Sequence, residues 1–225
     1  MTRRFAYVSL CWFLACALFT SAEARTWVVN SEGTGDAPTL QAAVDSTAVG
    51  DTIFVSAGDY EGPVILKQGT HLVGEPPAGS ASITGPFNSD LVVSVVSGTV
   101  ARLELGGVFG TGYGNPPRVI SSEDSIVEDC ILRASHFAVL GSGSLTLADC
   151  EIRATNGVRV EGDRLEIFRC TFEIQFASET PVGIQPQWPD PAALVVSDCV
   201  FRRNGSSSSQ NEPTLGWGFG TIHAI

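Results

Sequence analysis

Long apolar runs are missing from this chain once its first 24 residues are set aside. A membrane-spanning helix needs about 20 consecutive apolar residues, so we expect no membrane span in the remainder. Positive charge is also scarce: 13 Lys and Arg residues stand against 24 Asp and Glu, for a net charge of −11. An acidic surface repels nucleic acid and anionic lipid, so neither is an expected partner. It also repels polyanionic polysaccharides unless a cation such as Ca²⁺ bridges the two.

Familiar catalytic and metal-binding motifs are missing as well. There is no HExxH pair, no nucleophile elbow and no phosphate-binding glycine loop. The three histidines, His71, His136 and His223, share no spacing, and no two cysteines form a CxxC pair. The sequence therefore argues against a zinc site and predicts no cofactor.

The first 24 residues have the pattern of a secretory signal peptide. Arg3 and Arg4 form a basic start, residues 5–20 are almost continuously apolar, and residues 22–24 (Ala-Glu-Ala) are a small-x-small cleavage signal. Because Arg3, Arg4 and one Glu leave with this segment, cleavage after Ala24 leaves 201 residues with 11 basic and 23 acidic side chains. We expect a secreted or extracytoplasmic monomer of one domain. A lipid anchor at Cys16 is disfavoured because the residues after it stay apolar.

A short pattern repeats along the second half of the chain: an apolar residue, two bend residues, a cysteine, any residue, and another apolar residue. Three copies recur every twenty residues and a fourth follows 29 residues later: Val127–Leu132, Leu147–Ile152, Ile167–Phe172 and Val196–Phe201. A fixed period near twenty marks a coiled architecture in which each coil buries its inner face against its neighbours. Short apolar runs bounded by Gly, Asn, Asp and Ser, with no long helix after residue 46, predict an all-β coil.

The repeat also predicts which side chains face the interior. The inward positions of the four copies are Cys130 and Leu132, Cys150 and Ile152, Cys170 and Phe172, and Cys199 and Phe201. The four cysteines should stack on successive coils about 4.8 Å apart. Side chains at equivalent positions point in parallel, which is poor disulfide geometry, so a reduced, buried ladder is the favoured interpretation. The formation of one or two disulfides is the alternative interpretation, because an exported chain with an even number of cysteines commonly forms them.

The N-terminal part of the predicted domain contains one short amphipathic helix. Residues 38–45 place Leu40, Ala43 and Val44 on one face, and Thr39 can cap the helix start. We expect this helix to cover the open end of the first coil, where unpaired strand edges would otherwise invite association. Strands are predicted around it and after it at Thr26–Val29, Thr52–Val55, Val64–Leu66, Leu72–Val73, Ser82–Thr84, Leu91–Val96 and Val100–Leu105.

Residues 26–85 resemble the start of the pectinesterase family and of related right-handed parallel β-helix proteins. The matching segments are Val28-Val29, Gly33-x-Gly35-Asp36, Thr39–Val44, Gly50–Ile53, Gly58-x-Tyr60, Gly74 and Ile83–Gly85. Residues 125–203 resemble the β-helix repeat of pectate lyases and pectinesterases. The resemblance implies a right-handed parallel β-helix of about six coils over residues 25–203, with the N-terminal cap at 26–48 and a flexible or truncated tail at 204–225.

The activity motifs of that family have no counterpart in this chain. Pectinesterases carry a catalytic Asp in a Gly-x-x-Asp-Phe-x-Phe-Gly segment and an Arg in a Leu-Gly-Arg-Pro-Trp segment. The nearest strings here, Leu105–Gly110 and Leu215–Gly220, contain neither the Asp nor the Arg. The calcium-binding Asp pattern of pectate lyases has no convincing match either, so no catalytic residue is carried over.

In resembling enzymes the site lies on outward side chains of one sheet. Alternation along the strands predicts that Val139, Arg159, Glu161 and Gln185 point outward here. Arg159 with Glu161, near Gln185, could bind a sugar hydroxyl or carboxylate, and Trp188, in the insertion before the last repeat, could stack on a sugar ring. The alternative for each is a solvated strand face or loop packing. A pair of Glu161 and Asp163 could serve as glycosidase acid and base, although carboxylates so close at a turn are ordinarily solvated.

Two sets of carboxylates are candidates for calcium. Residues 123, 124, 128 and 129 (Glu, Asp, Glu, Asp) form an acidic cluster at a coil corner, and hard cations prefer several such oxygens. Asp129, Asp149 and Asp198 recur beside the cysteines, where an Asp most simply hydrogen-bonds its own backbone. Ca²⁺ is thus the one metal the sequence leaves open.

Two functions are compatible with this sequence. The leading hypothesis is a secreted protein that binds or processes a polysaccharide or cell-surface glycan, without a recognisable catalytic set. The alternative is a non-enzymatic, adhesin-like or structural surface module. No polar cap is evident after residue 203: either the tail covers the last coil with Leu215, Trp217, Phe219 and Ile222, or the chain is part of a longer protein.

Overall fold

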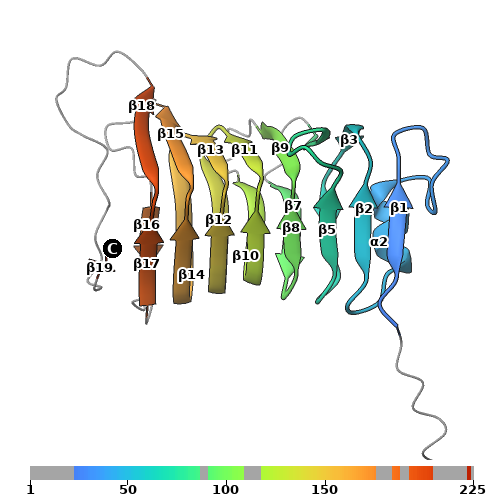
Figure 1. The fold of residues 1–225 in the computed structure, drawn as a ribbon, viewed down its shortest axis with the longest axis horizontal. Coiled ribbons are helices and arrows are strands. Elements are labelled where there is room, and N and C mark those ends of the chain that lie inside the picture. Colours follow the sequence, from blue (N-terminus) through green and yellow to red (C-terminus); the bar gives the residue numbers. More distant parts are fainter. Residues whose placement is uncertain are drawn as a thin grey trace, which may run out of the picture.

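The computed structural model describes residues 23–86, 91–108, 118–175, 184–187, 193–204 and 222–223. It is a right-handed parallel β-helix, as predicted, built from a 12-stranded sheet (sheet A) and a 7-stranded sheet (sheet B) with one short helix at the N-terminal end (Figure 1). Nearly all of the predicted signal peptide, together with Trp188, Leu215, Trp217 and Phe219, lies outside the described residues.

The successive coils from β2 to β18 contribute strands to both sheets, and the strand pairs of the described residues are parallel. Sheet A runs in the order β1-β2-β5-β8-β10-β12-β14-β17-β19, with β4, β7 and β16 paired beside this path; sheet B runs β18-β15-β13-β11-β9-β6-β3. The strands of sheet A are β1 (Thr26–Val29), β2 (Thr52–Val55), β4 (Val64–Ile65), β5 (His71–Gly74), β7 (Leu91–Val96), β8 (Thr99–Ala101), β10 (Arg118–Glu128), β12 (Phe137–Ala148), β14 (Asn156–Phe168), β16 (Ile184–Gln187), β17 (Ala193–Ser197) and β19 (Ile222–His223). Those of sheet B are β3 (Gly58–Glu61), β6 (Ala81–Thr84), β9 (Leu103–Val108), β11 (Ile131–Ala134), β13 (Glu151–Ala154), β15 (Thr171–Gln175) and β18 (Val200–Asn204).

A left-handed backbone residue marks the corner between the two sheets in five successive coils. These residues all have φ between 50° and 56°: Arg102, Asp129, Asp149, Arg169 and Asp198. Their positive φ turns the chain sharply, and aspartate tolerates this conformation better than most residues do. The predicted strand Val100–Leu105 is wrong in this respect, because the corner at Arg102 divides it into β8 and β9.

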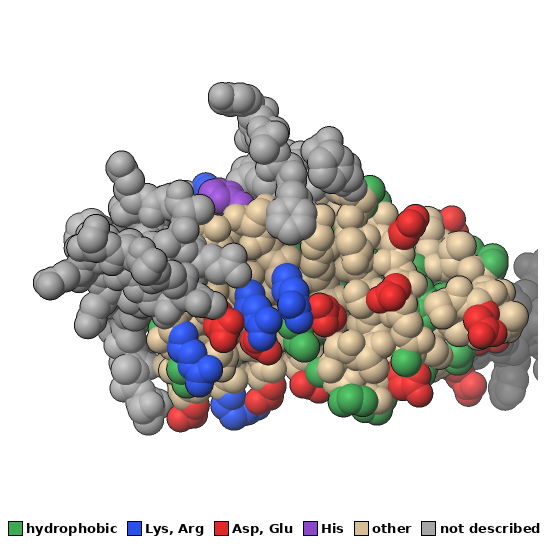
Figure 2. Space-filling model, turned by 90° about the horizontal axis from the view of Figure 1, so that it is seen from above, with side chains coloured by type: hydrophobic (Ala, Val, Ile, Leu, Met, Phe, Trp, Pro, Cys, Tyr) green, Lys and Arg blue, Asp and Glu red, His purple; other side chains and the backbone are tan. Residues whose placement is uncertain are grey.

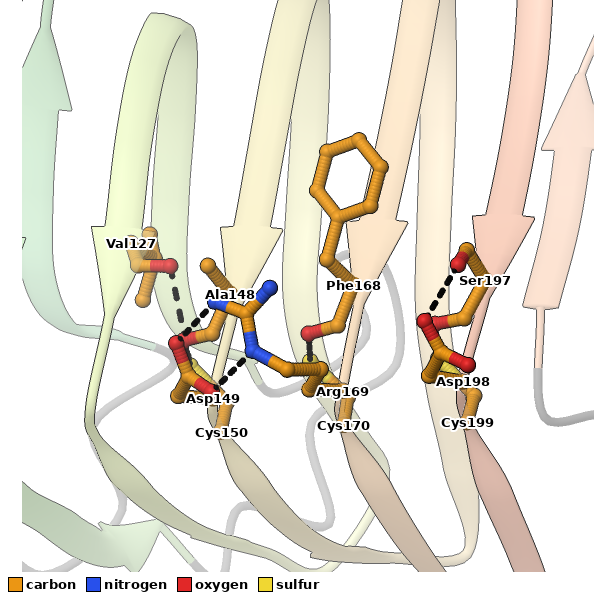
Figure 3. A network of polar contacts seen from close by, with 10 residues as sticks. All are labelled: Val127, Ala148, Asp149, Cys150, Phe168, Arg169, Cys170, Ser197, Asp198 and Cys199. Carbon is orange, nitrogen blue, oxygen red and sulfur yellow. Dashed lines mark hydrogen bonds and ion pairs between the residues drawn. The ribbon is translucent and has the colours of Figure 1, made fainter.

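The residue after each corner begins the buried interior ladder. The side chains that follow the first four corners are at most 2% exposed: Leu103, Cys130, Cys150 and Cys170. Cys199, after the fifth corner, packs against the same core and is partly exposed. The four cysteines are free thiols, and each Sγ donates to the carbonyl oxygen two residues before it, at 3.2–3.3 Å. Figure 3 draws Cys150, Cys170 and Cys199. Hydrogen bonding with Cys150, together with burial, raises the pKa of the Cys170 thiol to about 12.

The N-terminal helix α2 (Leu40–Ser46) forms where the amphipathic pattern predicts it. Thr39 is its N-cap and accepts a hydrogen bond from the Ala42 N–H at 3.1 Å. Leu40, Ala43 and Val44 are buried against the first coils, where the helix contacts β1, β2 and β4. At the other end Lys67 Nζ donates to the carbonyl oxygens of Asp45 and Thr47, at 2.7 and 2.8 Å. Among the described residues, no helix has the length and apolar character needed to cross a membrane.

The free edge of β1 is occupied by a single aspartate. The Val28 N–H donates to Asp36 Oδ2 at 2.9 Å, and the Asp36 N–H donates back to the Val28 carbonyl at 2.7 Å. Gly35 fits beside this edge because any Cβ there would lie 2.3 Å from the Val28 oxygen. At the C-terminal end, β19 pairs with β17 through Leu194 and Ile222, so part of the predicted tail extends sheet A.

Candidate binding face

The candidate site lies on the outward side of one half of sheet A. This half consists of β4, β7, β16 and the N-terminal halves of β10, β12 and β14. Register pairs a row of residues on consecutive coils, which we call the outer row: Ser94, Ser121, Leu140, Arg159 and Gln185. The preceding positions in four of these strands, Val93, Ile120, Val139 and Val158, are fully buried. Side chains alternate along a strand, so the outer row faces away from the core.

Arg159 is the charged residue of this row. Its Nη2 lies 3.3 Å from Glu161 Oε1, and its side chain is 28% exposed against 57% for that of Glu161. Its Cζ lies 5.8 Å from the centroid of the Phe137 ring, within the range of a cation–π contact. Phe137 is only 4% exposed, so the ring supports the guanidinium from the protein side. Arg159 is therefore positioned by neighbours on its own strand and on the preceding coil.

His136 and Asn156 lie near Arg159 and Phe137, at the N-terminal ends of β12 and β14. The Asn156 side-chain amide lies 3.1 Å from His136 Nδ1, and its backbone N–H donates to the His136 carbonyl at 2.8 Å. The imidazole packs edge-on against Phe137 with centroids 4.6 Å apart. Burial lowers the pKa of His136, and the positive charge of Arg159 lowers it further. The ring is thus held neutral beside the guanidinium.

Of the residues predicted to point outward, Arg159 and Glu161 do so and Val139 does not. Val139 is fully buried and pairs with Val158, while Arg159 pairs with Leu140. The offset between these coils is nineteen residues up to Ser142 and Glu161 but twenty from Ser144 and Arg164 onward. One extra residue in the turn of β14 causes this irregularity, so a uniform period of twenty assigns Val139 to the wrong face.

The other predicted residues are only partly placed. The backbone of Gln185 pairs with Arg159, which brings it to the outer row, but the side chains of Gln185 and Asp163 and all of Trp188 lie outside the described part of the chain. His136, Phe137 and Asn156 were not predicted. One signal was present: Asn156 follows His136 by twenty residues, the period of the repeat.

The acidic corner predicted as a calcium candidate has a structural role at one residue. Asp124, with φ 48°, accepts a hydrogen bond from the Ser144 N–H of the next coil at 2.8 Å. Of the aspartates that recur beside the cysteines, Asp149 is paired with Arg169, and Asp198 accepts a hydrogen bond from Ser197 Oγ (Figure 3). Nowhere in the described ranges do three or more His, Cys, Asp or Glu residues gather as a metal site.

The outer face of sheet B also carries charged residues, but in a different arrangement. Arg133 Nε lies 2.8 Å from Glu104 Oε1, and Arg153 bridges Glu151 and Glu173, the latter at 3.3 Å. Figure 2 shows basic and acidic side chains interleaved in this way over part of the surface. Each of the two arginines faces one or two carboxylates, so their charges are compensated within the protein.

Comparisons with known proteins support the fold. Neither a protein-family profile nor a curated protein matches the chain. Solved structures do: a pectin methylesterase in complex with a hexasaccharide, with TM-score 0.64 and 16% identity over 83% of this chain and 67% of that one. Pectin methylesterase PemA from Erwinia chrysanthemi matches with TM-score 0.64 and 15% identity over the same shares. The pectin methylesterase from Aspergillus niger matches with TM-score 0.51 and 14% identity over 89% of this chain and 91% of that one. This confirms the pectinesterase-like β-helix predicted from the sequence.

Proposed function

We propose that this chain is an exported protein that binds a polysaccharide along the outer row of sheet A, with Arg159 as the principal polar contact. The observation that carries the proposal is the setting of Arg159, which is partly exposed, paired with Glu161 and backed by the Phe137 ring. A guanidinium held in this way presents planar donors without having to be ordered on binding, which lowers the entropic cost of association.

The geometry of the fold suits a linear polymer. Neighbouring strands repeat about every 4.8 Å, so successive coils offer backbone and side-chain groups in a straight row to successive sugar units. One of the structural neighbours, a pectin methylesterase, was solved with a hexasaccharide bound. The net charge of −11 disfavours a densely anionic polymer, so a neutral or sparsely charged polysaccharide is the expected ligand class.

Binding to a panel of neutral and uronate-containing polysaccharides, measured by titration calorimetry, tests this proposal. We expect saturable binding that Arg159→Ala weakens by about tenfold or more, since hydrogen bonds to a charged group contribute about 1.5–3 kcal/mol each. Arg153→Ala is the matched control: its side chain is 34% exposed, is also paired with glutamates, and lies on the outer face of sheet B. It should leave the affinity unchanged.

Two results would count against the proposal. Loss of binding in Arg153→Ala, with Arg159→Ala unaffected, would place the binding surface on sheet B. Absence of binding to every glycan, combined with adhesion to cells or to other proteins, would favour the non-enzymatic surface module instead. Analysis of the bound polymers for shortened or modified chains, in the same samples, would show whether chemistry accompanies binding.

A further inference from the structure

Arg25 directly precedes the first strand, β1. Its carbonyl oxygen accepts a hydrogen bond from the Thr52 N–H at 2.8 Å, and the pairing of β1 with β2 starts at the next residue. Its guanidinium lies over the Trp27 ring, with Cζ 3.8 Å from the centroid. Glu23, Ala24 and Arg25 are all exposed and belong to no helix or strand, but the backbone of Arg25 is already hydrogen-bonded to the first coil. These backbone hydrogen bonds are made by the residue that directly follows the cleavage position predicted from the sequence.

The backbone nitrogen of Arg25 points at a buried carboxylate. It donates to Asp51 Oδ1 at 2.8 Å, while Asp51 Oδ2 accepts from the Ala48 N–H at 2.9 Å and from Trp27 Nε1 at 3.1 Å. Asp51 is 5% exposed. Hydrogen bonds from Ala48 and Arg25 lower its pKa, so the carboxylate is charged at neutral pH. A negative charge in a nearly closed site thus faces the backbone nitrogen of the residue that precedes β1.

We propose that Asp51 is a receiving site for the amino terminus that cleavage after Ala24 creates. Hydrolysis of the Ala24–Arg25 peptide bond by water, catalysed by a signal peptidase, gives a carboxylate on Ala24 and an α-ammonium group on Arg25. The ammonium nitrogen occupies the place of the amide nitrogen now 2.8 Å from Asp51 Oδ1, so a neutral hydrogen-bond donor becomes a charged one. Processing then adds an ion pair to the first coil that the precursor does not have.

This ion pair has a definite pH dependence. An ordinary α-amino group has a pKa of about 7.7–8.0, and a neighbouring carboxylate raises it. The stabilisation is fully present below the ordinary value and is lost as the pH rises through the raised one. The titratable and charged groups on the surrounding elements include the Arg25 guanidinium, Asp45 near the end of α2, Lys67, whose ammonium binds the Thr47 carbonyl, and His71, whose backbone N–H donates to the Asp51 carbonyl at 2.9 Å.

The amine content of this chain allows a direct test, because Lys67 is its only lysine. The full precursor carrying Lys67→Arg is exported by a host that cleaves the leader, and the product is treated with an amine-reactive reagent across pH 7–10. Mass spectrometry of the N-terminal peptide gives the labelling rate at each pH and hence the pKa of the α-amine. We expect Arg25 as the first residue and a pKa at least one unit above the control, equivalent to about tenfold slower labelling near pH 8.

The control is the same chain with Gly-Ser inserted between Ala24 and Arg25, which moves the α-amine away from Asp51 without changing the core. Equal pKa values for the two chains, or a natural amino terminus at another residue, would overturn the proposal. If Lys67→Arg prevents folding, the unsubstituted protein serves, since its two amines fall in different peptides. Asp51→Asn, where it folds, should abolish the difference. None of these readouts depends on polysaccharide binding, so the two proposals fail separately.

Discussion

Arg169 forms a two-point contact with Asp149 on the preceding coil. Its Nε lies 2.7 Å from Asp149 Oδ1 and its Nη2 2.6 Å from Oδ2 (Figure 3). Arg169 stands at a corner that aspartate occupies in neighbouring coils, so it interrupts a column of like charges formed with Asp129, Asp149 and Asp198. The hydrogen bonds of this pair lower the pKa of Asp149 and raise that of Arg169.

We expect Arg169→Asp to lower the melting temperature at low salt, because it completes an uninterrupted column of carboxylates. In 1 M NaCl, where the Debye length is about 3 Å, most of that loss should be recovered. Arg169→Asn is the control, since asparagine tolerates the left-handed backbone at φ 50° and removes only the charge. Equal melting temperatures for the two variants at low salt would show that charge at this corner is unimportant.

The cysteine ladder predicts unreactive thiols. With a pKa of about 12, Cys170 has a thiolate fraction of roughly 1 in 10,000 at pH 8, against about a quarter for an ordinary cysteine. Hydrogen bonding with Cys130, together with burial, raises the pKa of Cys150 as well. A disulfide reagent should therefore label the native protein slowly at these positions and label all four mature cysteines after unfolding in guanidinium without reductant. Two missing thiols in that second measurement would instead reveal a disulfide.

Lys67 is expected to stabilise the cap. Its ammonium group binds two carbonyl oxygens at the C-terminal end of α2, where the helix dipole favours positive charge. Lys67→Met should reduce the free energy of unfolding by about 1–2 kcal/mol, measured by urea denaturation. Lys67→Arg retains a donor of similar reach and should cost less. Equal losses in both variants would indicate that packing of the aliphatic stem, and not the charge, carries the effect.

The site geometry predicts a low titration midpoint for His136. Because its folded pKa lies below the ordinary value of about 6.5, the unfolded chain binds the proton more readily, and stability falls as the pH drops below that value. In Arg159→Ala the pKa should rise toward the ordinary value without reaching it, since burial is the larger cause. NMR titration of the imidazole resonances measures the pKa of His136 in the original protein and in Arg159→Ala. An unchanged midpoint would show that Arg159 does not act on the ring.

The repeat predicts the part of the fold in which the coils have equal length. Cys130, Cys150 and Cys170 occupy one column because each corner is followed by the same number of residues, and local alternation then assigns every neighbour to a face. The same reasoning fails at Val139, where one extra residue in a turn changes the register. It also misses the corner at Arg102, since arginine is not a residue that favours a positive φ.

The candidate site is harder to predict because it depends on contacts between coils. Arg159 and Glu161 are two residues apart, so strand alternation alone places them on one face. The approach of His136 and Phe137 to that pair depends on how one coil stacks on the next, and on where the strands β12 and β14 start. Composition and spacing carry no information on those starting points.

The contact between Asp36 and Val28 has a consequence for how copies of this molecule can meet. A stack of parallel strands is a template, and its first strand would ordinarily accept the last strand of another copy, so that fibres could grow end to end. Here the outward-facing donor and acceptor of Val28 are already bound by the chain's own aspartate. The ladder positions at Val28 are therefore not available to a second copy, and we expect head-to-tail polymerisation to be disfavoured at this edge.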